Sequence, residues 1–112
     1  MCKPVWSNLK RVAMREYGVL PEGCICRLTV LSFYPSQPVR MLRRLHQEGG
    51  TLFLVQVLPD AGISAWRGVR ALWYPTYGSG GWVDTNLDAE VGKLCRELDQ
   101  QLEAEVVNCL AL

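Results

Sequence analysis

The stretch Trp66–Asp84, WRGVRALWYPTYGSGGWVD, organises the fold that we expect for this chain. Its first half alternates over six residues and stops at Pro75, which is typical of a β-strand followed by a residue that cannot continue the ladder. The run Gly78–Gly81 then supplies the backbone freedom that a tight reversal needs, and Trp82-Val83 follows as a short returning strand. The stretch therefore predicts a β-hairpin that is rich in aromatic residues.

The aromatic side chains of this hairpin have two possible roles. Large aromatic residues dominate the cores of small domains, so the hairpin can simply fill the interior. Ligand sites, however, are usually apolar clefts with a few polar groups, and a glycine loop beside an aromatic cluster suits such a cleft. On the second interpretation the ligand-binding residues are Trp66, Trp73, Tyr74, Tyr77 and Trp82.

Three further segments before the hairpin have clear patterns. Pro4–Tyr17 has an apolar stripe at helical spacing and is followed by Gly18, so it predicts an N-terminal helix. Cys24–Tyr34 is rich in β-branched and aromatic residues and predicts a strand. Thr51–Leu58 (TLFLVQVL) predicts a second strand, which ends at a turn that begins with Pro59.

Ser36–Gly50 is the ambiguous segment. Ser36 suits a helix cap, and Pro38, Met41, Leu42 and Leu45 match the spacing of an apolar helix face, so we expect a middle helix. The alternative is a strand that pairs with the next one through Glu48-Gly49-Gly50. That pairing would shift the fold toward a small SH3-like barrel with flanking helices.

The last segment, Thr85–Leu112, predicts a long helix capped by Thr85 or Asn86. About 24 helical residues make a rod of roughly 36 Å, which is long for one small sheet to cover. The apolar stripe along the rod is therefore expected to pair with a second copy of the chain. The predicted oligomer interface consists of Leu94, Leu98, Leu102, Val106 and Leu110.

The overall composition is that of one globular domain spanning residues 1–112. Hydrophobic residues make up 49% of the chain, charged residues 21%, and the net charge is +1. No apolar run reaches the length of a membrane span, and the N-terminus carries no secretion signal, so we expect no membrane partner and a cytoplasmic location. The predicted fold class is α+β: a small, mostly antiparallel sheet of three to five strands with an N-terminal, a middle and a long C-terminal helix.

The sequence contains no recognisable catalytic, metal or cofactor signature. His46 is the single histidine and falls near the predicted end of the middle helix, where a cation is favourable. Cys24 and Cys26 lack the spacing of a zinc knuckle and are expected on one face of a buried strand. We therefore predict no metal and no cofactor, and an enzyme without a recognisable motif remains only an alternative.

Nucleic-acid binding is the other alternative. On a helix, three arginines of the middle segment would form a basic ridge, and two more flank the aromatic stretch. Arginine beside exposed aromatic rings suits single-stranded nucleic acid, although a sequence pI near 7.6 is low for such a domain. The residues concerned are Arg40, Arg43, Arg44, Arg67 and Arg70.

Taken together, these patterns predict a non-catalytic, cytoplasmic binding protein. It would form a homodimer or a higher homo-oligomer through the C-terminal helix. Its aromatic-lined site would take a small apolar or aromatic ligand, or a protein partner.

Overall fold

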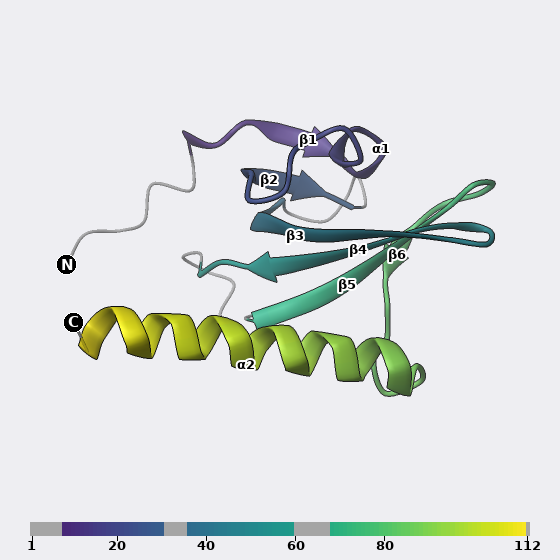
Figure 1. Cartoon of the computed structure of the whole chain (residues 1–112). Helices are drawn as coiled ribbons and strands as arrows, with labels where there is room; N and C mark the ends of the chain where they lie inside the picture. The colour runs from purple at the N-terminus through teal and green to yellow at the C-terminus, as the bar shows by residue number, and fades with distance from the viewer. Residues whose placement is uncertain (1–7, 31–35, 60–67, 112) are drawn as a thin grey trace.

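The computed structural model describes residues 8–30, 36–59 and 68–111, with side chains placed up to residue 105. Within these ranges the chain forms one curled, half-barrel sheet and two helices (Figure 1). The strands lie in sequence order, β1-β2-β3-β4-β5-β6, and every neighbouring pair is antiparallel except β1 and β2. The elements are β1 (Arg11–Ala13), α1 (Met14–Tyr17), β2 (Ile25–Thr29), β3 (Gln37–Gln47), β4 (Gly50–Val57), β5 (Gly68–Pro75), β6 (Gly81–Trp82) and α2 (Ala89–Ala111).

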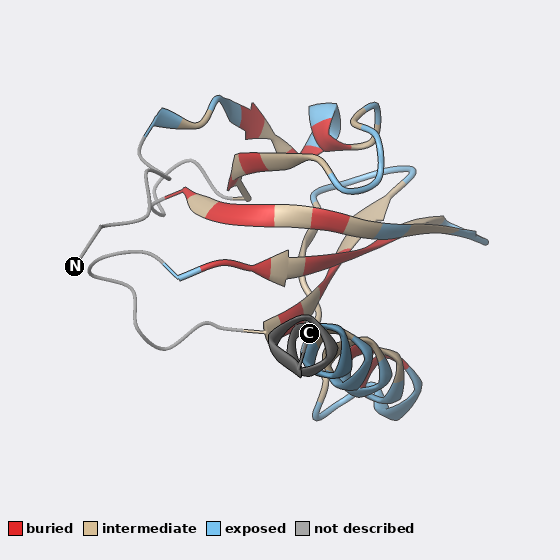
Figure 2. Cartoon of the chain, turned by 60° about the vertical axis from the view of Figure 1, so that its left-hand side comes forward, coloured by how far each residue is buried: buried red, intermediate tan, exposed pale blue. Residues whose placement is uncertain are grey.

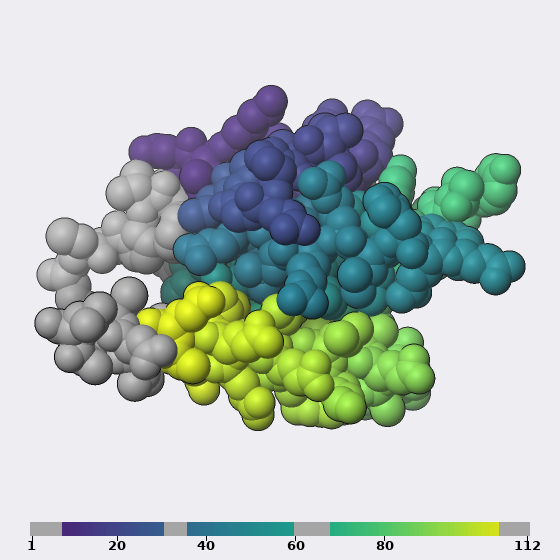
Figure 3. Space-filling view, viewed as in Figure 1, coloured from purple at the N-terminus to yellow at the C-terminus, as the bar shows by residue number. Residues whose placement is uncertain are grey.

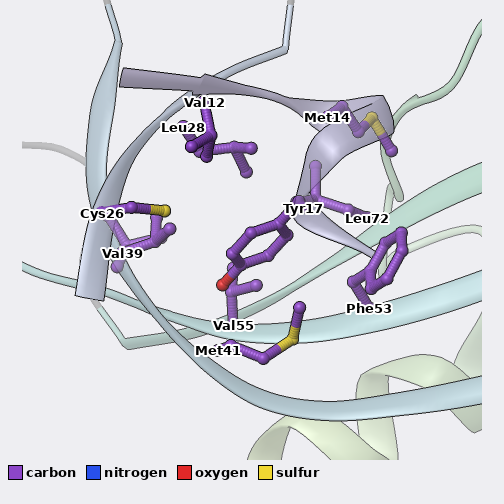
Figure 4. Packing of buried hydrophobic residues seen from close by; sticks show 11 residues of the cluster. Val12, Met14, Tyr17, Cys26, Leu28, Val39, Met41, Phe53, Val55 and Leu72 are labelled. Atoms are coloured by element: carbon purple, nitrogen blue, oxygen red, sulfur yellow. The ribbon is translucent and has the colours of Figure 1, made fainter. Parts of the chain in front are cut away.

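The two faces of the sheet carry separate hydrophobic clusters. Because successive side chains of a strand point to opposite faces, β4 contributes Phe53, Val55 and Val57 to one cluster and Leu52 and Leu54 to the other. We call the first the α1-side cluster, since α1 packs on it, and the second the α2-side cluster. Figure 4 shows the α1-side cluster gathered around one tyrosine ring, that of Tyr17.

The expected middle helix is wrong, because Ser36–Gly50 contains the longest strand of the sheet. β3 pairs with β4 through the turn at Gln47–Gly50, as the alternative interpretation of this segment proposed. A β-bulge between Met41 and Arg43 inserts one extra residue and so shifts the alternation of side chains by one. As a result Leu42 and Leu45 both reach the α2-side cluster at a spacing of three, which imitates a helix face.

The expected N-terminal helix is also wrong over the described part of its range. Only Met14–Tyr17 is helical, and the preceding three residues form β1. Val12 is buried because β1 pairs in parallel with β2, opposite Leu28. The apolar spacing of this segment therefore comes from a strand followed by one helical turn. Side chains of both elements pack in the α1-side cluster.

The long C-terminal helix is confirmed, and it runs along the sheet beside β5 (Figure 1). Its cap is Asp88 rather than Thr85 or Asn86: the Asp88 carboxylate oxygen Oδ1 accepts a hydrogen bond from the Val91 N–H at 3.1 Å. Val91 and Cys95 are buried against β5 and β4. The opposite side of the helix is exposed and polar (Figure 2).

The free edge of β5 is held by a side chain of α2. Asp99 Oδ1 accepts a hydrogen bond from the Val69 N–H at 3.1 Å. Gly68 allows this approach, because its φ is +85° and a Cβ there would lie 3.0 Å from Asp99 Oδ2. The helix thus satisfies a backbone donor that would otherwise be free to pair with another strand.

These observations correct the predicted fold class. The six-stranded mixed half-barrel replaces the small sheet of three to five strands, and two helices replace three. The physical reason is that β1 and β3 form strand pairs with their neighbours in the sheet, although the local spacing of their apolar residues resembles that of a helix.

Candidate functional site

The ends of two hairpins meet beyond the body of the sheet. The turn between β3 and β4 and the loop between β5 and β6 project together in the space-filling view (Figure 3). They are tied by a backbone hydrogen bond in which the Thr76 N–H donates to the Gly49 carbonyl oxygen at 2.8 Å. The hairpin ends therefore form one unit.

Two glycines make this close packing possible. A Cβ at Gly50 would overlap the backbone of Tyr74 and Pro75, and a Cβ at Gly80 would overlap the Trp73 carbonyl oxygen. The missing side chains allow the β3–β4 turn and the glycine loop to lie directly against β5. The Trp73 ring lies beside the first of these glycines, since its Cζ2 atom would be 2.9 Å from a Cβ there.

A hollow of about 460 Å³ lies next to this unit, between the sheet and the start of α2. Its volume falls in the range of small-ligand sites, roughly 300–1,000 Å³. Most of its lining is apolar or glycine and comes from β4, β5, β6, the residue that follows β6, and α2: Leu52, Trp73, Gly81, Trp82, Val83 and Val91. Gln47 and Asp88 are the polar residues of the lining.

Asp88 enters the lining because of the turn that precedes α2. Asp84 Oδ1 accepts a hydrogen bond from the Asn86 N–H at 2.9 Å, and the Asp84 carbonyl oxygen accepts one from the Asp88 N–H at 3.2 Å. This turn carries the chain from β6 back to the sheet. The capping carboxylate of Asp88 therefore comes to lie at the mouth of the hollow.

The predicted aromatic residues separate into distinct places. Trp73 and Trp82 line the hollow, although Trp82 also packs partly on the α1-side cluster. Tyr74 packs on that same cluster, and Tyr77 stands 91% exposed at the hairpin end. Trp66 lies outside the described residues.

The remaining lining residues could not be found from local motifs. Leu52 reaches the hollow because β4 pairs opposite Trp73, and Gln47 reaches it through the turn of the β3–β4 hairpin. Val91 and Asp88 reach the hollow because the first turn of α2 packs against the sheet. The available signal was the alternation of β4, which places Leu52 on the same face as Leu54.

The predicted basic ridge is not formed, because the segment that carries it is a strand. Arg43 lies opposite Leu54 of the α2-side cluster, and Arg44 lies opposite Phe53 of the α1-side cluster, so the two point to opposite faces. Arg44 donates a hydrogen bond to the Gly18 carbonyl oxygen next to α1. Arg40 and Arg70 are half-buried on β3 and β5, and Arg67 lies outside the described residues.

The described part of the predicted oligomer interface faces the chain's own sheet. Leu94, Leu98 and Leu102 are half-buried and pack on the α2-side cluster. The side chains of Val106 and Leu110 lie outside the description. Self-association through α2 stays a prediction, but the apolar stripe of α2 up to residue 102 already packs on the sheet of its own chain.

The buried thiols and the buried phenol belong to the core. Burial, with Cys24 nearby, raises the pKa of the Cys26 thiol to about 11, which keeps it neutral and unreactive near neutral pH. Burial raises the pKa of Tyr17 as well, with smaller effects from Cys26 and Cys24. The described cysteines, Cys24, Cys26 and Cys95, are free thiols.

Metal and membrane features are not found in the described ranges. No group of three or more potential ligands gathers among residues 8–30, 36–59 and 68–111. His46 is exposed and its Nδ1 lies 3.2 Å from Thr51 Oγ1 across the hairpin, rather than at a helix end. In the same ranges no helix is both long and apolar enough to cross a membrane.

Comparison of the chain with known protein families, curated proteins and solved structures gives no match.

Proposed function

We propose that this chain is a non-catalytic binding protein whose ligand site is the hollow beside Trp73. The observation that carries the proposal is the combination of volume and lining. A space of about 460 Å³ is bordered by two tryptophans and aliphatic side chains, and Asp88 is the one carboxylate among its described lining residues. Apolar clefts with few polar groups are the usual form of small-ligand sites.

The contacts that surround the hollow also favour binding. The Trp73 ring packs against Gly50 on one side and borders the hollow. The two hairpin ends are joined by a backbone hydrogen bond. A site that is formed before the ligand arrives loses less conformational entropy on binding. The hollow therefore suits a small ligand with an apolar body.

An enzyme remains the alternative, because a carboxylate beside the aromatic hairpin is the feature that would favour one. Asp88 supplies that carboxylate, but its Oδ1 is engaged in capping α2. Among the residues that the structure describes, the lining contains no histidine, cysteine, lysine or second carboxylate that could share acid–base work with it. The described lining thus favours binding over catalysis.

The cytoplasmic location and the homodimer belong to the same proposal. Free thiols at the three described cysteines fit a reducing compartment, and fractionation of cells that express the tagged chain checks the location. Light scattering on the full chain checks the dimer. A monomer at tens of micromolar would remove self-association from the proposal.

The binding site is tested by nuclear magnetic resonance of the full chain, with 2-phenylethanol as a neutral aromatic probe. Shifts are expected at the indole N–H of Trp73 and at the backbone amides of Val83 and Val91. Trp73→Leu should lower the affinity for the probe severalfold, as measured from the shifts of the two amides. The reason is that aromatic contacts contribute about 0.5–1.5 kcal/mol beyond the burial of apolar surface area. Tyr77→Ala is the matched control, since that ring is exposed and outside the lining. Shifts that avoid these amides, or an equal loss in both variants, would contradict the site.

A further inference from the structure

The described lining of the hollow carries one charged residue, and it is acidic. Asp88 is the charged side chain of the lining, and Gln47 is its neutral polar partner. Asp84 and Glu48 are exposed and adjoin lining residues in the sequence. The described lining therefore combines one carboxylate with mostly apolar side chains.

The described cations near the hollow do not line it. Lys93 follows Val91 by two positions on α2, and residues two apart lie on nearly opposite sides of a helix. His46 precedes Gln47 on β3, and neighbours on a strand point to opposite faces. Arg43 lies opposite Leu54 on the face of the α2-side cluster, and the Arg96 side chain lies close to Gly92. None of these four residues is in the described lining of the hollow.

The helix N-terminus does not turn the site into one for anions. A bare helix N-terminus attracts negative charge through its free N–H groups. Here the Val91 N–H already donates to Asp88 Oδ1, and the Gly92 N–H donates to the Asp88 carbonyl oxygen. A carboxylate has about four lone-pair sites, so the cap leaves Asp88 able to accept further hydrogen bonds from a ligand.

From this arrangement we propose that the ligand carries a cationic nitrogen on an apolar or aromatic body. This inference rests on the proposed function and narrows its ligand class. The ammonium or guanidinium group lies against the Asp88 carboxylate and the Trp73 ring, and the apolar body fills the space beside Leu52, Val83 and Val91. Tryptophan is the aromatic residue that attracts cations most strongly.

Three probes that differ mainly in their polar group test the proposal: 2-phenylethylamine, 2-phenylethanol and phenylacetate. Each is titrated into the full chain and followed by calorimetry and by the amide shifts of Val83 and Val91. The amine is expected to bind about fivefold more tightly than the alcohol, from one exposed ion pair and one cation–π contact. Phenylacetate should bind most weakly, and added salt should reduce the preference for the amine.

Asp88→Asn separates charge from helix capping, because asparagine and aspartate are comparable caps. The preference for the amine over the alcohol should fall to about twofold, since the ion pair is lost and the cation–π contact remains. Asp84→Asn is the matched control: it removes the same charge outside the lining and should keep most of the preference. N-acetyl-lysine methyl ester with a free side-chain ammonium shows whether a peptide side chain can serve as the source of the cation.

The outcomes distinguish the two proposals. If the amine and the alcohol bind equally well at the hollow, or if phenylacetate binds best, the ligand class is wrong and the site stands. If Asp84→Asn abolishes the preference as fully as Asp88→Asn does, the selectivity comes from net charge, and the assignment to Asp88 is overturned. If none of the probes shifts the amides of the hollow, the proposed binding function fails as well.

Discussion

Asp99→Ala tests whether the C-terminal helix is fastened to the sheet by a hydrogen bond as well as by apolar packing. The substitution removes the acceptor of the Val69 N–H, which lies 3.1 Å from Asp99 Oδ1. Val69 is 5% exposed, so water has little access to its backbone donor. An unsatisfied buried donor costs about 1–3 kcal/mol, and we expect a loss near 2 kcal/mol in the free energy of unfolding.

Two further variants isolate that cause. Asp99→Asn keeps an acceptor oxygen and should lose about half as much, because hydrogen bonds to charged groups are roughly twice as strong as neutral ones. Glu97→Ala removes an exposed acid from the same helix and should stay within about 0.5 kcal/mol of the original chain. Alanine favours helices more than aspartate does, so a loss in Asp99→Ala is not a failure of helix formation.

Urea unfolding followed by circular dichroism measures these free energies, and hydrogen exchange reports on the Val69 amide directly. Exchange at Val69 should accelerate about tenfold or more in Asp99→Ala, since 1.4 kcal/mol corresponds to a factor of ten. If Asp99→Ala unfolds like Glu97→Ala and Val69 stays equally protected, the reasoning about this contact is refuted.

Three other predictions address the glycines and the core. In urea unfolding, Gly68→Ala should destabilise the protein more than Gly23→Ala. The two glycines share a φ near +85°, but only at Gly68 would an added Cβ lie 3.0 Å from the Asp99 carboxylate. Equal losses of stability would exclude that contact as the cause. Between pH 9 and pH 11 stability should fall as pH rises, because the unfolded thiol of Cys26 ionises from about 9.0 while the folded one stays neutral to about 11. Cys26→Ala should reduce this loss in the free energy of unfolding by at most about 3 kcal/mol. A loss of the same size in Cys26→Ala would contradict the raised pKa. Tyr17→Phe should be neutral or stabilising by up to about 1 kcal/mol, because the hydroxyl is buried without a hydrogen-bond partner among the described residues; a clear loss in thermal unfolding would reveal a partner.

The sequence by itself determined the elements whose local pattern agrees with their tertiary role. The strands of the aromatic hairpin and the strand at Thr51–Leu58 were predicted at nearly their observed bounds. The long C-terminal helix was predicted correctly as a helix, but with its cap at Thr85 or Asn86 instead of Asp88. In each of these elements one periodicity runs through the whole segment. The helix pattern, for example, continues from Val91 through Leu102 on one face.

The tertiary structure alone decided the two segments in which local spacing and pairing disagree. In β3 the bulge between Met41 and Arg43 moves Leu42 and Leu45 onto one face, and a one-residue shift reverses the faces of all later side chains. No local rule shows where such a bulge falls, because it depends on the register of β3 against β4. At the N-terminus, the pairing of β1 with β2 likewise overrode a helical spacing.

The candidate site shows the same division. Sequence composition directed attention to Trp73 and Trp82, because aromatic residues beside a glycine loop often mark a cleft. Leu52, Val91 and the Asp88 carboxylate joined them only through strand register and the docking of α2 on β5. The chain's local chemistry thus supplied the aromatic rings, and long-range packing supplied the hollow and its charge.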